Sequence, residues 1–242
     1  MPLTEAFAFT AANGRPVEGR LERPDGPARG WALFAHCFAC GRDSLAAVRI
    51  SRGLAARGIG VLRFDFAGLG EAPAPEGFCT DVADVTAAAR ALASAGMAPA
   101  LLVGHSLGGA AVIAAAGDTP GVRAVATLGA PFDVAHVLET VNAREGMGRA
   151  GGRDIRLSET FVREVERHDQ AERLARLDAA LMVLHAPRDE VVGVDQAGLI
   201  FQAARHPKSF VALDGADHLL TDPADADWTA GLIAAWAERY LA

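Results

Sequence analysis

Short apolar runs alternate with helical segments along most of the chain, and this order constrains the fold more than any other feature. The runs expected to be strands cover residues 31–36, 60–66, 100–105, 122–130, 180–187 and 208–215. Segments with helical spacing lie between or after them, at 44–58, 81–96, 107–117, 195–205 and 224–241. Strands that alternate with helices form a mostly parallel sheet with helices on both faces. The sequence therefore predicts an α/β fold.

Two regions depart from this alternation. The segment AFAFTAANGRPVEGRLERP places Asn13-Gly14 between two extended runs. Because both residues tolerate positive φ, the dipeptide predicts a hairpin of antiparallel strands at one edge of the sheet. Residues 132–178 carry no clear strand and include at least one amphipathic helix, expected at 158–177. The sequence thus predicts a single domain over residues 1–242, with 132–178 inserted as a small helical cap.

Size and charge exclude several classes of protein. The chain of 242 residues is long enough to bury one sizeable core. Its net charge of −7 argues against nucleic acid as a partner, because phosphates are also negative. The sequence has no apolar run of the roughly 18 residues that a membrane span needs, and MPLTEAFAFT does not resemble a signal peptide. With three cysteines, no disulfide framework is expected, and the cytoplasm is the expected location.

The strongest chemical signal is LLVGHSLGG at residues 101–109, in which Gly104 and Gly108 frame Ser106 as G-x-S-x-G. An apolar run precedes the motif and an alanine-rich helical segment follows it, which is the setting that the motif requires. At such a turn, side chains at the two glycine positions would collide with neighbouring backbone. The helix N-terminus also favours developing negative charge. We therefore predict that Ser106 is a nucleophile.

A serine hydroxyl needs a general base, and the base needs an acid to orient it. His218 follows the last predicted strand in LDGADHLL, and Asp189 follows the strand before it in HAPRDEVV. Both loops leave the carboxyl ends of strands, where ligands and chemistry gather in parallel sheets. We predict that His218 is the base and Asp189 the acid, with Glu190 as the alternative acid. Asp217 is expected to make turn hydrogen bonds instead.

These motifs resemble those of the α/β-hydrolase superfamily. GHSLGG, PRDEVVG and GADHLL match the positions of its serine, acid and histidine, and the order of strands and helices matches along nearly the whole chain. More narrowly, FAHCFACGRD, VLRFDFAGLG and HPKSFVALDGADHLL resemble the hydrolase half of proteins in which such a domain is fused to an OsmC-like domain. The resemblance implies an α/β-hydrolase fold and a catalytic triad of Ser106, Asp189 and His218.

The resemblance also implies a role for FAHCFACGRDS at residues 34–44. In this superfamily the loop after the third strand often reads His-Gly-x, and the N–H of x completes an oxyanion hole. Here His36-Cys37-Phe38 takes that place, with a cysteine where glycine is usual. The backbone N–H groups of Phe38 and Leu107 are therefore expected to bind the oxyanion.

The spacing of Cys37 and Cys40 suggests a zinc site or a redox pair as alternatives to simple packing. A structural zinc site needs four ligands, and neither these cysteines nor Cys79 has a histidine pair at metal-ligand spacing. A redox pair needs one thiolate with a depressed pKa, and this alternative stays open. We expect the thiols to pack the loop, and we expect no metal and no cofactor.

The reaction that these residues predict is hydrolysis of a small-molecule carboxylic ester with a short or medium acyl chain, through an acyl-enzyme. Thioesters, amides and peptides remain alternatives, because the triad does not select the leaving group. Four side chains are candidates for the substrate pocket, namely Phe132, Phe161, Cys37 and His105.

Overall fold

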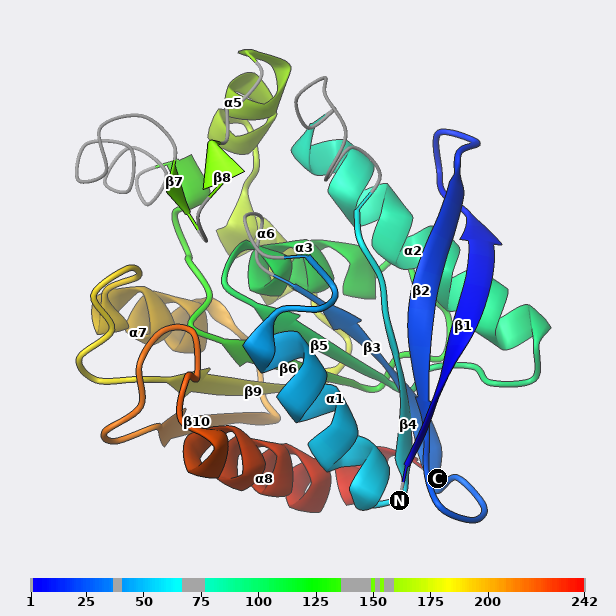
Figure 1. Ribbon diagram of the computed structural model, residues 1–242. Helices are drawn as coiled ribbons and strands as arrows, with labels where there is room; N and C mark the ends of the chain where they lie inside the picture. The colour runs from blue at the N-terminus through cyan, green and yellow to red at the C-terminus, as the bar shows by residue number, and fades with distance from the viewer. Residues whose placement is uncertain are drawn as a thin grey trace.

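The structure is a computed structural model that describes residues 2–36, 41–66, 77–135, 149–150, 153–154 and 159–241. Helices pack on both faces of one central sheet, so the predicted α/β class is confirmed (Figure 1). No helix in these described segments is both long enough and apolar enough to cross a bilayer.

The central sheet contains eight strands in the order β1-β2-β4-β3-β5-β6-β9-β10. Their bounds are Leu3–Thr10 (β1), Pro16–Arg23 (β2), Gly30–Ala35 (β3), Ile59–Arg63 (β4), Leu101–His105 (β5), Ala124–Leu128 (β6), Ala180–His185 (β9) and Lys208–Ala212 (β10). From β4 to β10 all neighbouring strands are parallel. Every residue of β4, β5, β6 and β9 is buried, as expected of strands covered on both faces.

The N-terminal hairpin is confirmed as an antiparallel pair at one edge of the sheet. Strand β1 pairs with β2 from Leu3–Arg23 to Thr10–Pro16, and β2 pairs antiparallel with β4. Gly14 takes a φ of +84° in the turn, and the Asn13 side chain accepts the Arg15 N–H at 3.0 Å. The predicted hairpin is therefore present, but of the two residues expected to tolerate positive φ only Gly14 adopts it, and Asn13 contributes a side-chain hydrogen bond instead.

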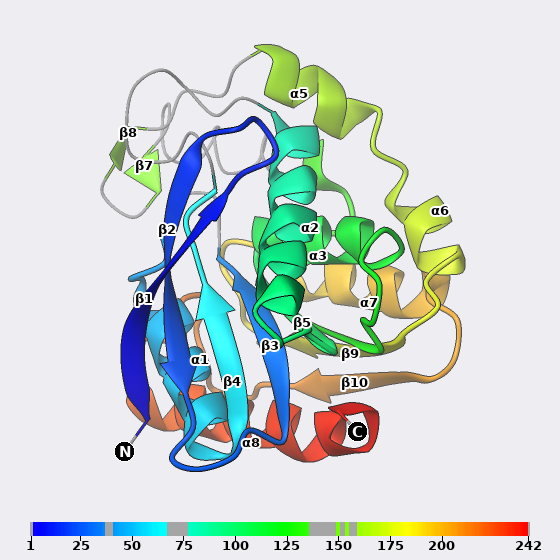
Figure 2. The ribbon, with the colours of Figure 1, turned by 90° about the vertical axis from the view of Figure 1, so that its right-hand side faces the viewer.

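Two layers of helices enclose the sheet (Figure 2). One layer contains α1 (Leu45–Ala56) and α8 (Pro223–Leu241), and the other contains α2 (Phe78–Ser94), α3 (Leu107–Ala116) and α7 (Val194–Ala203). Each layer packs its own apolar cluster against one face of the sheet. Helix α3 is buried along its whole length, because α2 and α6 (Gln170–Ala175) cover its outer side. It begins directly after β5, which fixes the position of the predicted nucleophile.

The cap differs from the prediction in two respects. The helical segment expected at 158–177 is interrupted, and it forms two helices, α5 (Glu159–Glu166) and α6. The helix breaks because the Asp169 side chain accepts the Glu172 N–H at 2.8 Å and so starts a new helix. The segment 132–178 also contains a two-stranded ribbon, β7 (Arg149–Ala150) with β8 (Arg153–Asp154), where we expected no strand.

Candidate active site

Ser106 occupies a strained turn between β5 and α3. Its φ of +55° and ψ of −126° are rare for a residue with a side chain. A Cβ at Gly104 would collide with the Gly108 carbonyl, and one at Gly108 would collide with the Ala35 carbonyl. Both glycines are therefore required by close backbone approach, as the motif predicted. Strain of this kind, at about 1–3 kcal/mol, persists only where the surrounding structure enforces it, and it gathers at functional sites.

Backbone hydrogen bonds hold this turn in place. The Ser106 N–H donates to the Leu128 carbonyl at 2.8 Å, which joins the turn to the end of β6. The Ser106 carbonyl accepts the Gly109 N–H at 2.8 Å, inside the first turn of α3. Leu107 is the first residue of α3, and the N–H groups of a helix's first turn have no acceptor within the helix. The half-buried serine therefore lies beside the first N–H groups of α3 and the positive end of its helix dipole.

The structure brings Asp189 and His218 into direct contact. His218 Nδ1 lies 2.7 Å from Asp189 Oδ2, and the two side chains are only 6% and 1% exposed. The other carboxylate oxygen, Oδ1, accepts the N–H groups of Val191 and Val192 at 2.9 and 2.8 Å. A Cβ added at Gly129, which follows β6, would lie 3.1 Å from His218 Nδ1 and 3.2 Å from Asp189 Oδ2. The acid and the base therefore meet at the same end of the sheet as the serine turn.

These contacts keep Asp189 ionised. Burial acts to raise the pKa of Asp189, but the hydrogen bond and charge of His218, together with the Val191 and Val192 N–H groups, outweigh it. The net pKa of Asp189 is lower than its ordinary value. A buried carboxylate that is hydrogen-bonded to Nδ1 fixes the histidine tautomer, so that Nε2 is the nitrogen that accepts and donates a proton.

Neighbouring acids are arranged differently. Glu190 is exposed, on the solvent side of the same loop. Asp217 makes the turn hydrogen bonds expected of it, since its side chain accepts both the N–H and the hydroxyl of Thr221.

Two buried histidines contact the loops that carry the pair. His105 Nε2 lies 2.7 Å from the His218 carbonyl oxygen, and His185 Nε2 lies 2.8 Å from the Val192 carbonyl oxygen. His105 was predicted as a pocket residue, and it is 1% exposed. Sequence reasoning gave His185 no role. Its only signal in the sequence was a polar residue at the end of an otherwise apolar strand.

A network of charges lies on the other side of β5, around the ends of β3 and β4. Asp65 Oδ1 accepts the Arg42 N–H at 2.5 Å and lies 3.4 Å from His36 Nε2. Burial acts to raise the pKa of Asp65, but the contacts with His36 and Arg42 leave it lower than the ordinary value. Buried Arg63 donates to the Arg42 carbonyl at 2.6 Å and to buried Glu22 at 3.0 Å. Sequence reasoning missed this network entirely.

The predicted oxyanion donor Phe38, together with Cys37 and Cys40, lies outside the described residues. The other two pocket candidates are placed. Phe161 is fully buried in the apolar cluster and meets the Phe78 ring edge-on, with 6.4 Å between centroids. Phe132 is half-buried, and its N–H donates to Gln196 Oε1 at 3.1 Å. Phe161 thus joins the cap to the start of α2.

Within the described segments, no group of three or more His, Cys, Asp or Glu side chains could hold a metal ion. The thiol of Cys79 is exposed, and burial of part of the residue together with Glu164 raises its pKa. This is the opposite of the shift that a reactive thiolate requires.

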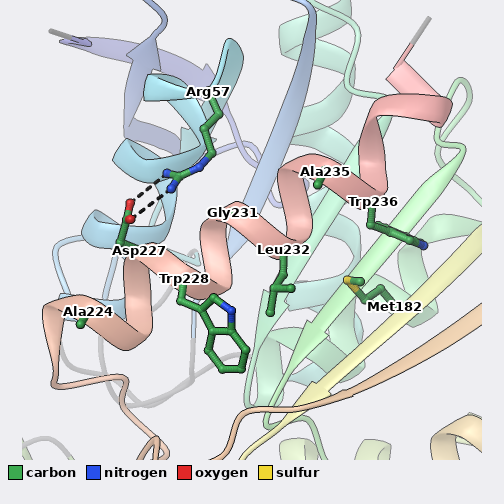
Figure 3. Close-up of a pocket in the computed structure, with 9 residues that line it drawn as sticks. All are labelled: Arg57, Met182, Ala224, Asp227, Trp228, Gly231, Leu232, Ala235 and Trp236. Carbon is green, nitrogen blue, oxygen red and sulfur yellow. Dashed lines mark hydrogen bonds and ion pairs between the residues drawn. The ribbon is translucent and has the colours of Figure 1, made fainter.

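An apolar groove of about 760 Å³ lies away from these residues, along α8 (Figure 3). Trp228, Leu232 and Met182 line it, and the ion pair between Arg57 and Asp227 borders it, with 2.9 Å between the nearest atoms. None of the residues that line it belongs to the Ser106, Asp189 and His218 set. The groove is therefore formed by residues other than the predicted catalytic ones.

Comparisons with known proteins agree with this geometry. A family model described as "alpha/beta hydrolase fold" matches residues 32–173. The structure is similar to the esterase domain of a Rhodothermus marinus protein, with 42% identity, a TM-score of 0.80, and coverage of 99% of this chain and 100% of that one. It also resembles dienelactone hydrolase from Anabaena variabilis, with 19% identity, a TM-score of 0.75, and coverage of 100% and 99%.

A third similar structure is a puromycin-hydrolyzing peptidase from Mycobacterium tuberculosis, with 22% identity and a TM-score of 0.77. That match covers 99% of this chain but 39% of the peptidase. A comparison with curated protein sequences finds no match.

Proposed function

Because the chain belongs to the alpha/beta hydrolase fold family, we propose that it is a serine hydrolase that cleaves carboxylic esters. The observation that carries this proposal is the 2.7 Å bond between His218 Nδ1 and Asp189, at the sheet end that holds Ser106 in its strained turn. A serine alone is a poor nucleophile, and a buried carboxylate–imidazole pair is the usual means of activating it.

In the proposed first step, Ser106 Oγ attacks the ester carbonyl carbon, and His218 Nε2 takes the hydroxyl proton. Asp189 stays ionised and stabilises the imidazolium, consistent with its lowered pKa. When the tetrahedral intermediate collapses, His218 gives the proton to the leaving alcohol. Water then attacks the acyl-enzyme with His218 as base, which releases the carboxylic acid and restores the Ser106 hydroxyl.

The oxyanion of each tetrahedral intermediate would be bound by backbone N–H groups. Leu107 is well placed to supply one of them, because it begins α3 directly after the nucleophile. Phe38 would supply the second. Removing one such donor costs about 3–4 kcal/mol in related chemistry, so the pair accounts for a large part of the expected rate enhancement.

The similarity to an esterase domain at 42% identity favours esters over the alternatives. Thioesters and amides remain possible substrates of the same triad, but the peptidase match at 22% identity supports the fold alone. Short or medium acyl chains are proposed, with Phe132 and Cys37 as residues that contact the substrate. Phe161 and His105 are 0% and 1% exposed, so we propose that they support the pocket wall without contacting the substrate.

Labelling with a fluorophosphonate, followed by peptide mass spectrometry, tests the nucleophile. We expect the label on Ser106, and we expect Ser106→Ala to lose p-nitrophenyl acetate turnover by about 10⁴-fold or more. Ser94→Ala is the matched control, because Ser94 is an exposed serine at the end of α2. A label elsewhere, or full turnover by Ser106→Ala, would overturn the proposal. A series of p-nitrophenyl esters of increasing acyl length then defines the substrate range.

A further inference from the structure

Two buried histidines lie against the acid–base pair, and the proposed reaction uses neither ring. His105 is the last residue of β5 and His185 the last residue of β9, so each lies at the strand end next to the site. They are 1% and 0% exposed. A buried imidazole that takes no part in catalysis and binds no metal needs another physical explanation.

The His105 ring connects the nucleophile directly to the base. It belongs to the residue before Ser106, and its Nε2 lies 2.7 Å from the His218 carbonyl oxygen. The centroids of the His105 and His218 rings are 5.0 Å apart. A single side chain therefore spans the distance between the nucleophile turn and the loop of the base.

The His185 ring plays the same part for the acid. Its Nε2 lies 2.8 Å from the Val192 carbonyl oxygen, while the Val192 N–H donates to Asp189 Oδ1 at 2.8 Å. The peptide groups of Val192 are thus held on both sides, by the histidine and by the catalytic carboxylate. This closes the loop from residue 189 to residue 192 around the acid.

The partners of both rings fix their chemical state. A carbonyl oxygen only accepts, so each Nε2 must carry the proton and donate. Among the described residues, neither Nδ1 has a hydrogen-bond partner, so no acceptor is present there to stabilise a second proton on either ring. Burial, and next the charge of His218, lowers the pKa of His105 to about 3; burial likewise lowers the pKa of His185. Both rings are therefore neutral donors when the enzyme works.

The loop that carries His218 has two features that make the contact from His105 important. It follows β10, which is the edge strand of the sheet and has a neighbour on one side only. His218 lies six residues beyond Ala212, the end of β10, and Leu220 has a φ of +51°. A loop with positive φ at a leucine is strained, and it keeps that shape only when other contacts enforce it.

We propose that His105 and His185 are positioning residues, whose Nε2–H groups hold the main chain of the base loop and of the acid loop so that His218 and Asp189 stay aligned with Ser106. This inference rests on the proposed hydrolase function. It adds two residues that affect the reaction only by positioning the members of the triad. The neutral state matters, because a charged ring 5.0 Å from His218 would oppose the imidazolium that forms in each step.

The experiment compares His105→Phe, which keeps a flat ring without a donor, with His105→Gln, whose amide N–H reaches the place of Nε2. Initial rates with p-nitrophenyl acetate give kcat and KM separately. We expect the Phe variant to lose kcat by up to about 10²-fold, with KM unchanged, as misplacement of reacting groups does. We expect the Gln variant to recover at least a tenth of the wild-type kcat. His185→Phe and His185→Gln should behave in the same way.

Two controls separate this effect from loss of folding. Leu54→Ala removes a fully buried side chain of α1, outside the site, and should lower the thermal unfolding midpoint without changing kcat of the folded enzyme. If His105→Phe does not fold, His105→Asn replaces it, because its amide is one methylene too short and should show the loss that Gln does not. Equal kcat in the donor and non-donor variants would overturn the inference.

The outcome also distinguishes the inference from the function on which it rests. If the wild-type protein turns over no ester and takes no fluorophosphonate label, the proposed function fails. If the wild-type protein is active and His105→Phe matches it, the function stands and the positioning role fails. Proton NMR adds an independent readout, since the bonded Nδ1–H of His218 should exchange faster with water in His105→Phe than in His105→Gln.

Discussion

The two sides of the nucleophile strand β5 are held by opposite kinds of interaction. On the acid–base side, towards β9 and β10, neutral imidazoles donate to main-chain carbonyls, and Asp189 Oδ2 lies 2.7 Å from His218 Nδ1 and 3.6 Å from His185 Nε2. On the loop-anchor side, towards β3 and β4, arginines pair with carboxylates. We define the loop-anchor side by Glu22, His36, Arg42, Asp43, Arg63 and Asp65.

The difference follows from what each side must do. During the proposed reaction the acid–base side gains and loses a proton on His218, so its surroundings must not add a competing charge. The loop-anchor side contains no proposed proton carrier. It secures residues 41–43 after the segment that carries Phe38, and strong fixed charges suit that task. Neutral donors therefore lie beside the proposed proton carrier, whereas ion pairs hold residues that flank the 37–40 segment.

Asp189→Asn should give the largest effect on the acid–base side. The amide leaves the loop nearly the same shape but can favour the wrong tautomer of His218, and in a comparable triad this costs about 10⁴-fold in kcat. Turnover of p-nitrophenyl acetate measures it. Glu190→Gln, in the exposed neighbour, is the control and should stay within about twofold of wild type. A greater loss in Glu190→Gln than in Asp189→Asn would reassign the acid.

Arg63→Met should give the largest effect on the loop-anchor side, and it should appear in stability. Arg63 and Glu22 are 3% and 0% exposed, so removing the cation leaves a buried carboxylate without its nearest cation. Breaking such a pair costs about 3–5 kcal/mol of unfolding free energy. Urea unfolding followed by circular dichroism measures it.

The double variant Arg63→Met with Glu22→Gln sharpens this result. It removes both charges, so most of the lost stability should return. If the double variant is as unstable as the single one, packing and not charge explains the role of Arg63.

The pH dependence of stability should reveal the buried neutral histidine His105 on the acid–base side. The expected effect is smaller than those of the substitutions above. The ordinary pKa of His105 is 6.5, and its pKa in the folded protein is about 3. Between these values the unfolded chain binds a proton on this ring and the folded protein does not, so stability falls as pH falls. From about pH 6.5 to about pH 4.5 this group alone removes about 2–3 kcal/mol.

His105→Gln provides the comparison, because it cannot titrate. Its unfolding free energy in urea should decline less than that of wild type over the same pH range. The groups that face His105 are His218, Asp189 and His36. Asp189 stays ionised throughout this range, since its pKa is lowered. Parallel pH curves for wild type and variant would show that His105 is protonated in the folded protein, contrary to our assignment.

Local patterns in the sequence predicted the sheet, the hairpin and the serine turn, because each depends on residues close together in the chain. The apolar run at 100–105 became β5 over 101–105, and G-x-S-x-G gave the strained Ser106. The break in the cap helix also had a local signal, since Asp169 and Glu172 form the start of a capping box. The apolar periodicity did not reveal the break, because Leu174, after the break, continues the apolar stripe that begins at Phe161.

The charge network and the histidine pair had no local signal. Arg63 and Glu22 are 41 positions apart and meet only because β2 pairs with β4 in one register. His105 and His218 are 113 positions apart, and the contact is made to a carbonyl oxygen that every residue has. Side-chain to backbone contacts of this kind depend on how loops close over strand ends. Neither the composition of the chain nor the spacing of its motifs predicts how these loops close.

Asp65→Asn should give the smallest of these effects and the most specific test of the loop-anchor side. Asp65 contacts His36 before the 37–40 segment and Arg42 after it, so one carboxylate joins the two ends of that segment. An amide still accepts the Arg42 N–H but lacks the charge that attracts its guanidinium, which lies 3.1 Å away. If Phe38 is an oxyanion donor, kcat for p-nitrophenyl acetate should fall about tenfold, close to 1.4 kcal/mol, at constant KM. Asp43→Asn is the matched control, because the exposed Asp43 pairs with Arg63 in the same network, does not contact His36, and reaches Arg42 only at 3.9 Å. A tenfold loss in both variants would mean that the network supports the fold in general, whereas a loss confined to Asp65→Asn would locate its role at the oxyanion loop.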